Sequence, residues 1–187
     1  NANESAAIAT LKNIASAQAQ CQASGAIDTN NNGAGEFGFF SELSGAQTVR
    51  TSGGAVGSGT DRVAPPVLSA AFGNVDAAGR VLRSGYYFRM HLPDATAGFE
   101  TENTADQVQA ANSEVMWGCY AWPSSFGNSG IRTFFVNQSG DVLGCRNRTA
   151  QYSGTGTVPT ACTAAFLVAG GMDGTVAANV TAADSEA

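Results

Sequence analysis

The chain has 187 residues, of which 43% are apolar and 13% charged, and its formal net charge is −6. This length fits a single domain, and the apolar fraction is sufficient for a core. No run of lysines or arginines would neutralise successive phosphates or an anionic lipid surface, which excludes nucleic acid and acidic membranes as expected partners. The sparse charge and the near absence of lysine favour an exported protein.

The first periodic segment is residues 3–24, NESAAIATLKNIASAQAQCQAS. Its apolar residues recur at three- and four-residue steps, which predicts a long helix with one narrow apolar stripe. The stripe consists of Ala7, Ile8, Leu11, Ile14, Ala15 and Cys21. We expect Asn3 or Ser5 to cap the start of this helix and Gly25 to end it in a left-handed turn. The stripe must lie against a sheet or other helices, because the helix alone would be marginal.

The next segment, IDTNNNGAGEF, places oxygen-bearing side chains at alternate positions, namely Asp28, Asn30 and Asn32. This spacing matches the first half of a calcium loop, in which a glycine, here Gly33, makes the sharp turn. The twelfth position, where a bidentate glutamate is due, is Phe39, so Glu36 at the ninth would supply the carboxylate, directly or through water. Calcium is one interpretation, and a tight turn closed by side-chain hydrogen bonds to the backbone is the other.

The following residues predict a short helix and then a long loop. Phe37, Phe40 and Leu43 keep helical spacing, and Gly45 is expected to close that helix. Residues 44–80 are rich in Gly, Ser, Ala and Pro, which predicts an irregular surface loop.

Four later segments predict antiparallel strands between residues 84 and 147: SGYYFRMHLP, EVMWGCYAWP, RTFFVNQ and DVLGCRN. The last two predict a hairpin around Ser139 and Gly140, with Val136 opposite Leu143 and Phe134 opposite Cys145. A thin helix stripe together with such strands indicates an α+β fold, a long N-terminal helix packed on an antiparallel β-sheet in a single domain. Residues 150–187 predict no firm structure, and their acidic end, ADSEA, is expected to fray.

The four cysteines are too scattered for a zinc site of the usual spacing. They are Cys21, Cys119, Cys145 and Cys162. An even number suits disulfides in an oxidising compartment, and four cysteines allow three pairings among which the sequence does not choose. The other interpretation is four buried free thiols, since free cysteine behaves as a small apolar residue.

No catalytic motif stands out. The only histidine, His91, lies in a predicted strand without a neighbouring partner, so a surface or half-buried strand position is favoured. Neither GxSxG nor a phosphate-binding glycine loop occurs. Trp117, Tyr120 and Trp122 could form a sugar-stacking face, but alternation puts the two tryptophans on opposite faces of a strand, which favours core positions. We therefore expect a protein that is not an enzyme.

Three short motifs, in their order after the helix, resemble a known family. The first is Glu36, Phe37 and Gly38, and the second is Ser84, Gly85 and Tyr86. The third consists of Gly130, Arg132, Phe134, Gly140 and Val142. With the helix, this order resembles type IV pilin-like proteins and the pseudopilins of type II secretion, with Phe in place of Tyr in the first motif. Residues 150–187 carry no motif of that family.

The resemblance implies a structural subunit whose N-terminal helix packs on an antiparallel sheet and binds other pilin or pseudopilin subunits. It implies an extracytoplasmic location, in the periplasm or on the bacterial cell surface, with the precursor anchored in the membrane by an apolar, N-terminally methylated half-helix. That half is absent from this sequence. Some pseudopilins bind calcium, which adds interest to Asp28, and no other cofactor is implied. The alternative function is an extracellular, adhesin-like module that binds a glycan or protein surface through residues 44–80 or the aromatic strand.

Overall fold

In the computed structural model, which describes residues 1–187, helix α1 spans Ala2–Ser24. The predicted start was wrong: Asn1 is the N-cap, because its side chain accepts a hydrogen bond from the Glu4 N–H and Glu4 bonds back in a capping box. The predicted end is confirmed, since Gly25 follows the helix in the left-handed conformation with φ 65°. Helix α1 is therefore capped at both ends.

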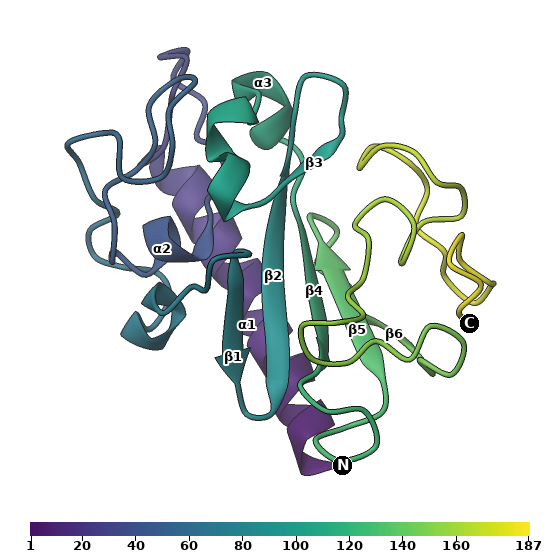
Figure 1. Cartoon of the computed structure of the whole chain (residues 1–187). Helices are drawn as coiled ribbons and strands as arrows, with labels where there is room; N and C mark the ends of the chain where they lie inside the picture. The colour runs from purple at the N-terminus through teal and green to yellow at the C-terminus, as the bar shows by residue number, and fades with distance from the viewer.

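Helix α1 lies along one face of the sheet (Figure 1). Its buried residues recur every three or four positions and are Ala7, Leu11, Ile14, Ala17, Gln18 and Cys21. The predicted stripe is confirmed at its centre, while Ile8 and Ala15 lie at its half-buried margins. The sequence pattern missed Gln18, whose amide bonds both the N–H and the carbonyl of Gly38. A buried polar side chain is tolerated there because both of its amide groups are paired.

The sheet has six strands in the order β1-β2-β4-β5-β6, and β3 pairs with β2; every pair is antiparallel. The strands are β1 Arg80–Arg83, β2 Tyr86–Pro93, β3 Phe99–Glu100, β4 Gly118–Pro123, β5 Thr133–Asn137 and β6 Leu143–Cys145. Four short helical segments flank them: α2 Phe40–Leu43, η1 Ala70–Gly73, η2 Glu102–Gln107 and α3 Ala110–Ser113. The α+β prediction of a long N-terminal helix on an antiparallel sheet is thus confirmed.

Alternation along the strands creates two cores. The face toward α1 carries Tyr86, Phe88, Met90, Leu92, Cys119, Ala121, Phe134 and Val136. The opposite face carries Tyr120, Trp122 and Phe135, which pack against Tyr152, Ala161, Ala165 and Phe166. Trp117 belongs to the first core and Trp122 to the second, as the alternation predicted, and both are buried. The aromatic strand is core on both sides.

Residues 150–187, the tail, cover the second face of the sheet, beside β5 and β6 (Figure 1). The prediction that the acidic end frays was wrong, because Glu186 is buried. Its carboxylate accepts hydrogen bonds from the backbone N–H groups of Arg148, Thr149 and Ala150. A carboxylate that satisfies three N–H groups fixes the end of the tail to the chain that leaves β6.

The predicted hairpin exists, but its register differs by one residue. Leu143 lies opposite Phe135, and Cys145 lies opposite Thr133. The turn is longer than the predicted Ser139–Gly140 pair: Gly140 donates to the Asn137 carbonyl and has φ 81°. This is the geometry of a three-residue loop with glycine in the left-handed position. The shift moves Cys145 to the tail side of the sheet.

The remaining boundaries show where local patterns fail. Strand β4 begins at Gly118 instead of residue 114, because Glu114 still caps α3. Residues 44–79 are irregular apart from η1, as predicted, but strand β1 occupies Arg80–Arg83. It pairs with β2 through a tight turn at Ser84 and Gly85, both with positive φ. Such short strands depend on their neighbours more than on their own sequence.

We predict that Leu11→Ala lowers the free energy of unfolding by about 2–5 kcal/mol, because Leu11 is fully buried between α1 and the sheet. Urea unfolding followed by circular dichroism measures this loss. Lys12→Ala, at the exposed neighbouring position, is the matched control and should change stability by less than about 0.5 kcal/mol. Equal effects of the two changes would contradict the packing of α1 described above.

Candidate functional site

The most unusual feature of the interior is a group of buried charged side chains, Arg50, Glu36 and Glu42, which together with the half-buried Glu102 and the buried Ser113 we call the Arg50 cluster. Arg50 is 3% exposed, and Glu36 and Glu42 are fully buried. One guanidinium nitrogen lies 2.6 Å from a Glu42 carboxylate oxygen, and another lies 2.9 Å from Glu36. Buried charges are tolerated only when they are paired in this way. The cluster ties together three segments that follow α1.

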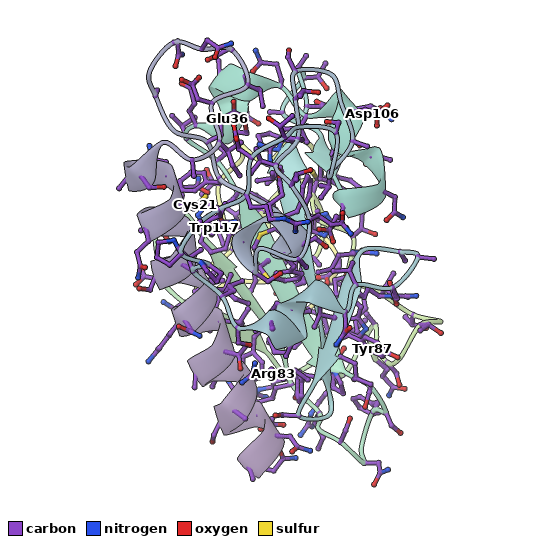
Figure 2. All side chains as sticks on the ribbon, turned by 90° about the vertical axis from the view of Figure 1, so that its left-hand side faces the viewer. Cys21, Glu36, Arg83, Tyr87, Asp106 and Trp117 are labelled. Carbon is purple, nitrogen blue, oxygen red and sulfur yellow. The ribbon has the colours of Figure 1, made fainter.

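Glu36, a predicted calcium ligand, uses both carboxylate oxygens within the protein. Oε1 accepts hydrogen bonds from the N–H and hydroxyl of Thr29. Oε2 accepts from Arg50 and from the Ser113 hydroxyl. Figure 2 shows Glu36 inside the molecule near the end of α1. Its role is to hold the loop that leaves α1 against Arg50 and α3.

Glu102 is the least satisfied member of the cluster. Its Oε1 accepts a hydrogen bond from the Ser41 N–H, whereas its Oε2 is buried without a partner. Burial, with a smaller contribution from the negative charge of Glu42, raises the pKa of this carboxyl to about 7 against the lowering effect of Ser41. Arg50 thus pairs with Glu36 and Glu42, whereas Glu102 lies outside these ion pairs and keeps a proton near neutral pH.

The predicted calcium loop forms a turn. Asp28 Oδ1 accepts from the Asn32 N–H and Oδ2 from the Gly33 N–H, at 3.1 and 2.9 Å. The side-chain oxygens of Asn30 and Asn32 also accept backbone N–H groups, and their amide nitrogens donate to Glu114. Of the four predicted ligands, Asp28, Asn30 and Asn32 thus close the turn, while Glu36 bonds Thr29, Arg50 and Ser113. The geometry favours the turn.

Glycine is required where this loop passes the end of α1. A Cβ at Gly35 would lie 1.9 Å from the Gln22 carbonyl oxygen, and one at Gly38 would lie 2.9 Å from Ile27. The first distance is far below a van der Waals contact, so no other residue fits at Gly35 without moving the backbone. The close approach explains the glycines around Glu36.

All four cysteines are free thiols in the structure, with no pair at disulfide distance, so the expected disulfides are not formed. Cys21, Cys119 and Cys162 are buried, and Cys145 is half-buried. Burial raises the pKa of Cys21 to about 12 and that of Cys145 and Cys162 to about 11. Such thiols react more slowly than the low-pKa thiols that act as nucleophiles.

His91 is buried, not at or near the surface as the sequence favoured. It is 1% exposed and contacts the rings of Phe99 and Tyr120 edge to face. Burial, together with the charge of Arg89, lowers the pKa of His91 well below its usual value, so the ring is neutral. Its Nδ1 has no hydrogen-bond partner. No group of three His, Cys, Asp or Glu side chains is arranged to hold a metal ion.

The exposed side of α1, its outer face, is the largest regular surface in the molecule. It consists of Ala2, Ser5, Ala9, Lys12, Asn13, Ser16, Ala19, Gln20 and Ala23. These side chains are small or uncharged except for Lys12. Figure 2 shows α1 at the left edge of the view, with no other segment on its outer side. No helix is both long and apolar enough to span a membrane.

The motifs quoted above have positional roles. Phe37 packs against Trp117, and Gly38 is paired with Gln18 of α1. The Tyr86 hydroxyl donates to the Arg132 carbonyl, and a Cβ at Gly130 would lie 2.3 Å from that hydroxyl oxygen. The motif residues therefore fix α1 and the strands relative to one another.

A family model described as "Protein of unknown function (DUF2950)" matches residues 1–148 of the 187. The chain belongs to the DUF2950 family. No curated protein and no solved structure matches it. The DUF2950 match includes α1, the Arg50 cluster and all six strands, and it stops before the tail.

The Arg50 cluster predicts a pH-dependent stability. The raised pKa of Glu102 means that the folded state keeps a proton that the unfolded chain loses, so stability falls as pH rises from about 5 to 8. Glu102→Gln mimics the protonated carboxyl and should gain stability over wild type across this range, on the order of 2 kcal/mol.

Urea unfolding at four pH values from 5 to 8 measures the difference between the Glu102→Gln and wild-type proteins. Asp106→Asn, in the same short helix but exposed, is the matched control (Figure 2). A difference for Glu102→Gln that does not change with pH, or an equal trend in the control, would contradict the raised pKa.

The turn between α1 and Gly35 predicts that calcium does not stabilise the protein. Since Asp28 and Glu36 are already saturated by hydrogen bonds, millimolar calcium should leave the thermal midpoint unchanged, while Asp28→Ala should cost roughly 1 kcal/mol by freeing two N–H groups. Differential scanning fluorimetry with calcium, and with magnesium as control, tests this. A calcium-specific rise that Asp28→Ala abolishes would establish the metal site instead.

Proposed function

We propose that this protein is a structural, non-enzymatic subunit of an extracytoplasmic filament of the type IV pilus or type II secretion pseudopilus kind. Copies of the subunit associate through α1. The observation that carries the proposal is the one-sided burial of this helix: one face is buried, and the other is an exposed surface of mostly small, uncharged residues. The resemblance of the three motifs to pilin-like proteins agrees with this arrangement.

The composition of the outer face supports close packing of helices. Helix axes pack 8–10 Å apart, and small side chains at the contact permit the shortest of these distances. Solvent-facing helix surfaces usually carry charged residues, but here Lys12 is the only fully charged side chain among the nine outer positions. Such a face loses little side-chain entropy and few charge–water contacts when a second copy covers it.

The attachment of α1 at both ends supports the same role. Near the N-terminus, a Glu4 oxygen accepts hydrogen bonds from the N–H groups of Ile131 and Arg132, and Asn3 donates to the Ser129 carbonyl. Near the C-terminus of the helix, Gln18 holds Gly38. A helix fixed in this way presents its outer face as a rigid surface, which an ordered polymer requires.

The alternative function is that of an extracellular binding module. One of the two surfaces expected for such a module, the aromatic strand, is buried. Tyr120 and Trp122 are buried under the tail, and Trp117 is buried under α1, so none of them forms an exposed platform for a sugar ring. Residues 44–80 remain as the surface that such a module would use. We prefer the filament because the exposed outer face that it requires runs along the whole length of α1.

The proposal predicts that subunits cross-link through α1 in cells that produce the full-length gene product. Ala9→Cys puts a thiol at the centre of the outer face, and a short bismaleimide should then yield a ladder of multimers on denaturing gels. The native cysteines give little background because three are buried and Cys145 is half-buried.

Ser52→Cys, exposed in the 44–80 loop, is the matched control and should cross-link weakly or to other partners. Thermal unfolding of both purified variants confirms that they fold. A ladder from Ser52→Cys and none from Ala9→Cys, in cells where both proteins accumulate, would rule out assembly through α1.

A further inference from the structure

A cavity of about 470 Å³ lies between the tail side of the sheet and the tail itself. This volume is within the range of pockets that hold small molecules. The cavity is separate from α1, the Arg50 cluster and the proposed assembly surface, and most of its lining residues are apolar. Residues 177–182, which belong to the tail, form one of its walls.

The floor of the cavity comes from β5 and β6. Thr133 and Phe135 alternate onto the tail side of β5, and the observed register puts Cys145 and Leu143 directly opposite them. These four side chains form a flat, mainly apolar floor. Ala164, Ala165 and the alanine-rich segment 177–182 surround it, and alanine leaves the space that larger side chains would fill. The cavity is thus a consequence of the hairpin register and of the composition of the tail.

One polar atom in the floor has no partner. The Thr133 hydroxyl is buried, with the residue 4% exposed, and forms no hydrogen bond within the protein. A buried hydroxyl without a partner costs free energy, and a ligand with one acceptor or donor at this point would recover it. The other buried polar groups at the cavity are occupied: Glu186 accepts three backbone N–H groups, and the Tyr152 hydroxyl donates to Asp184. Asn179 and Thr181, which also belong to the lining, are exposed to solvent.

The side chains that line the cavity do not favour a charged ligand. No lysine, arginine or histidine lines the cavity, so a carboxylate, sulfate or phosphate would find no countercharge. The only charged side chain in the lining, Glu186, would repel an anion, and its oxygens are already used, so a cation gains little. A neutral molecule is the occupant that this lining accepts at least cost.

We propose that this cavity is a binding site for a small, neutral, largely apolar molecule that carries one hydroxyl or carbonyl group. The apolar body lies on Phe135 and Leu143 under the alanine-rich wall, and the single polar group bonds the Thr133 hydroxyl. The tail, which lies beyond the part of the chain matched by the family model, makes this site; the sheet alone would leave only an exposed apolar surface.

Fluorescence titration with a neutral, apolar probe tests the site on the full chain. N-phenyl-1-naphthylamine reports the apolar cavity, and we expect a saturable rise in its emission at one site per chain. Leu143→Trp fills the cavity from the floor and should weaken binding at least tenfold. Val115→Trp, at a position 60% exposed and outside the lining, is the control and should leave binding unchanged.

Thr133→Val tests the polar contact, because it replaces the hydroxyl by a methyl group of the same shape. Binding of 2-naphthol should weaken roughly three- to tenfold, as expected for one lost hydrogen bond. Binding of naphthalene, which has no hydroxyl, should stay the same or improve. Equal effects on the two compounds would overturn the role of Thr133.

Protection of Cys145 from alkylation tests the site in the wild-type protein, without any variant. Cys145 lies in the floor, so N-phenyl-1-naphthylamine should slow its alkylation by N-ethylmaleimide at least threefold, as followed by peptide mass mapping. Alkylation that the probe does not slow, or probe emission that rises without saturation, would show that no such site exists.

Discussion

The structure depends on covering both faces of a small, strongly apolar sheet. Alternation puts large apolar side chains on each side, and neither set can remain in water without a large loss of free energy. Helix α1 covers one face with a narrow stripe of buried side chains, so it has to lie along the sheet in one orientation. The tail covers the other face without regular secondary structure. The two covers leave one long helical surface exposed and a partly open cavity between the tail and the sheet.

Buried polar contacts explain how a thin helix stripe is held in place. Apolar burial alone would permit α1 to slide or rotate, because alanine offers little shape for packing. The Gln18 amide bonds both backbone groups of Gly38, and the Glu36–Arg50 pair fixes the segment that carries Gly38. The polar cluster thus adds specificity to a contact whose free energy is hydrophobic, the role of buried polar groups in some other proteins. A fixed helix is what an assembling subunit would need.

The sequence predicted those parts of the fold that local patterns control. The helix period, the left-handed Gly25 and the alternation that separates Trp117 from Trp122 all follow from residues close together in the chain. The hairpin register failed because the choice between a two- and a three-residue loop depends on the pairing of whole strands. Burial of Glu36, Glu42 and Arg50 could not be predicted, since their partners lie in other segments. The tail was missed because only contact with the sheet orders it.

Hydrogen–deuterium exchange with mass spectrometry tests most directly whether α1 and the sheet form one unit. If α1 is held by the sheet along its length, the amides of residues 7–21 should exchange as slowly as those of β4, and residues 51–59 should exchange fastest. Exchange in α1 much faster than in β4, at rates close to those of the loop, would show a helix that separates from the sheet. A rigid outer face, and with it the proposed mode of assembly, would then have no basis.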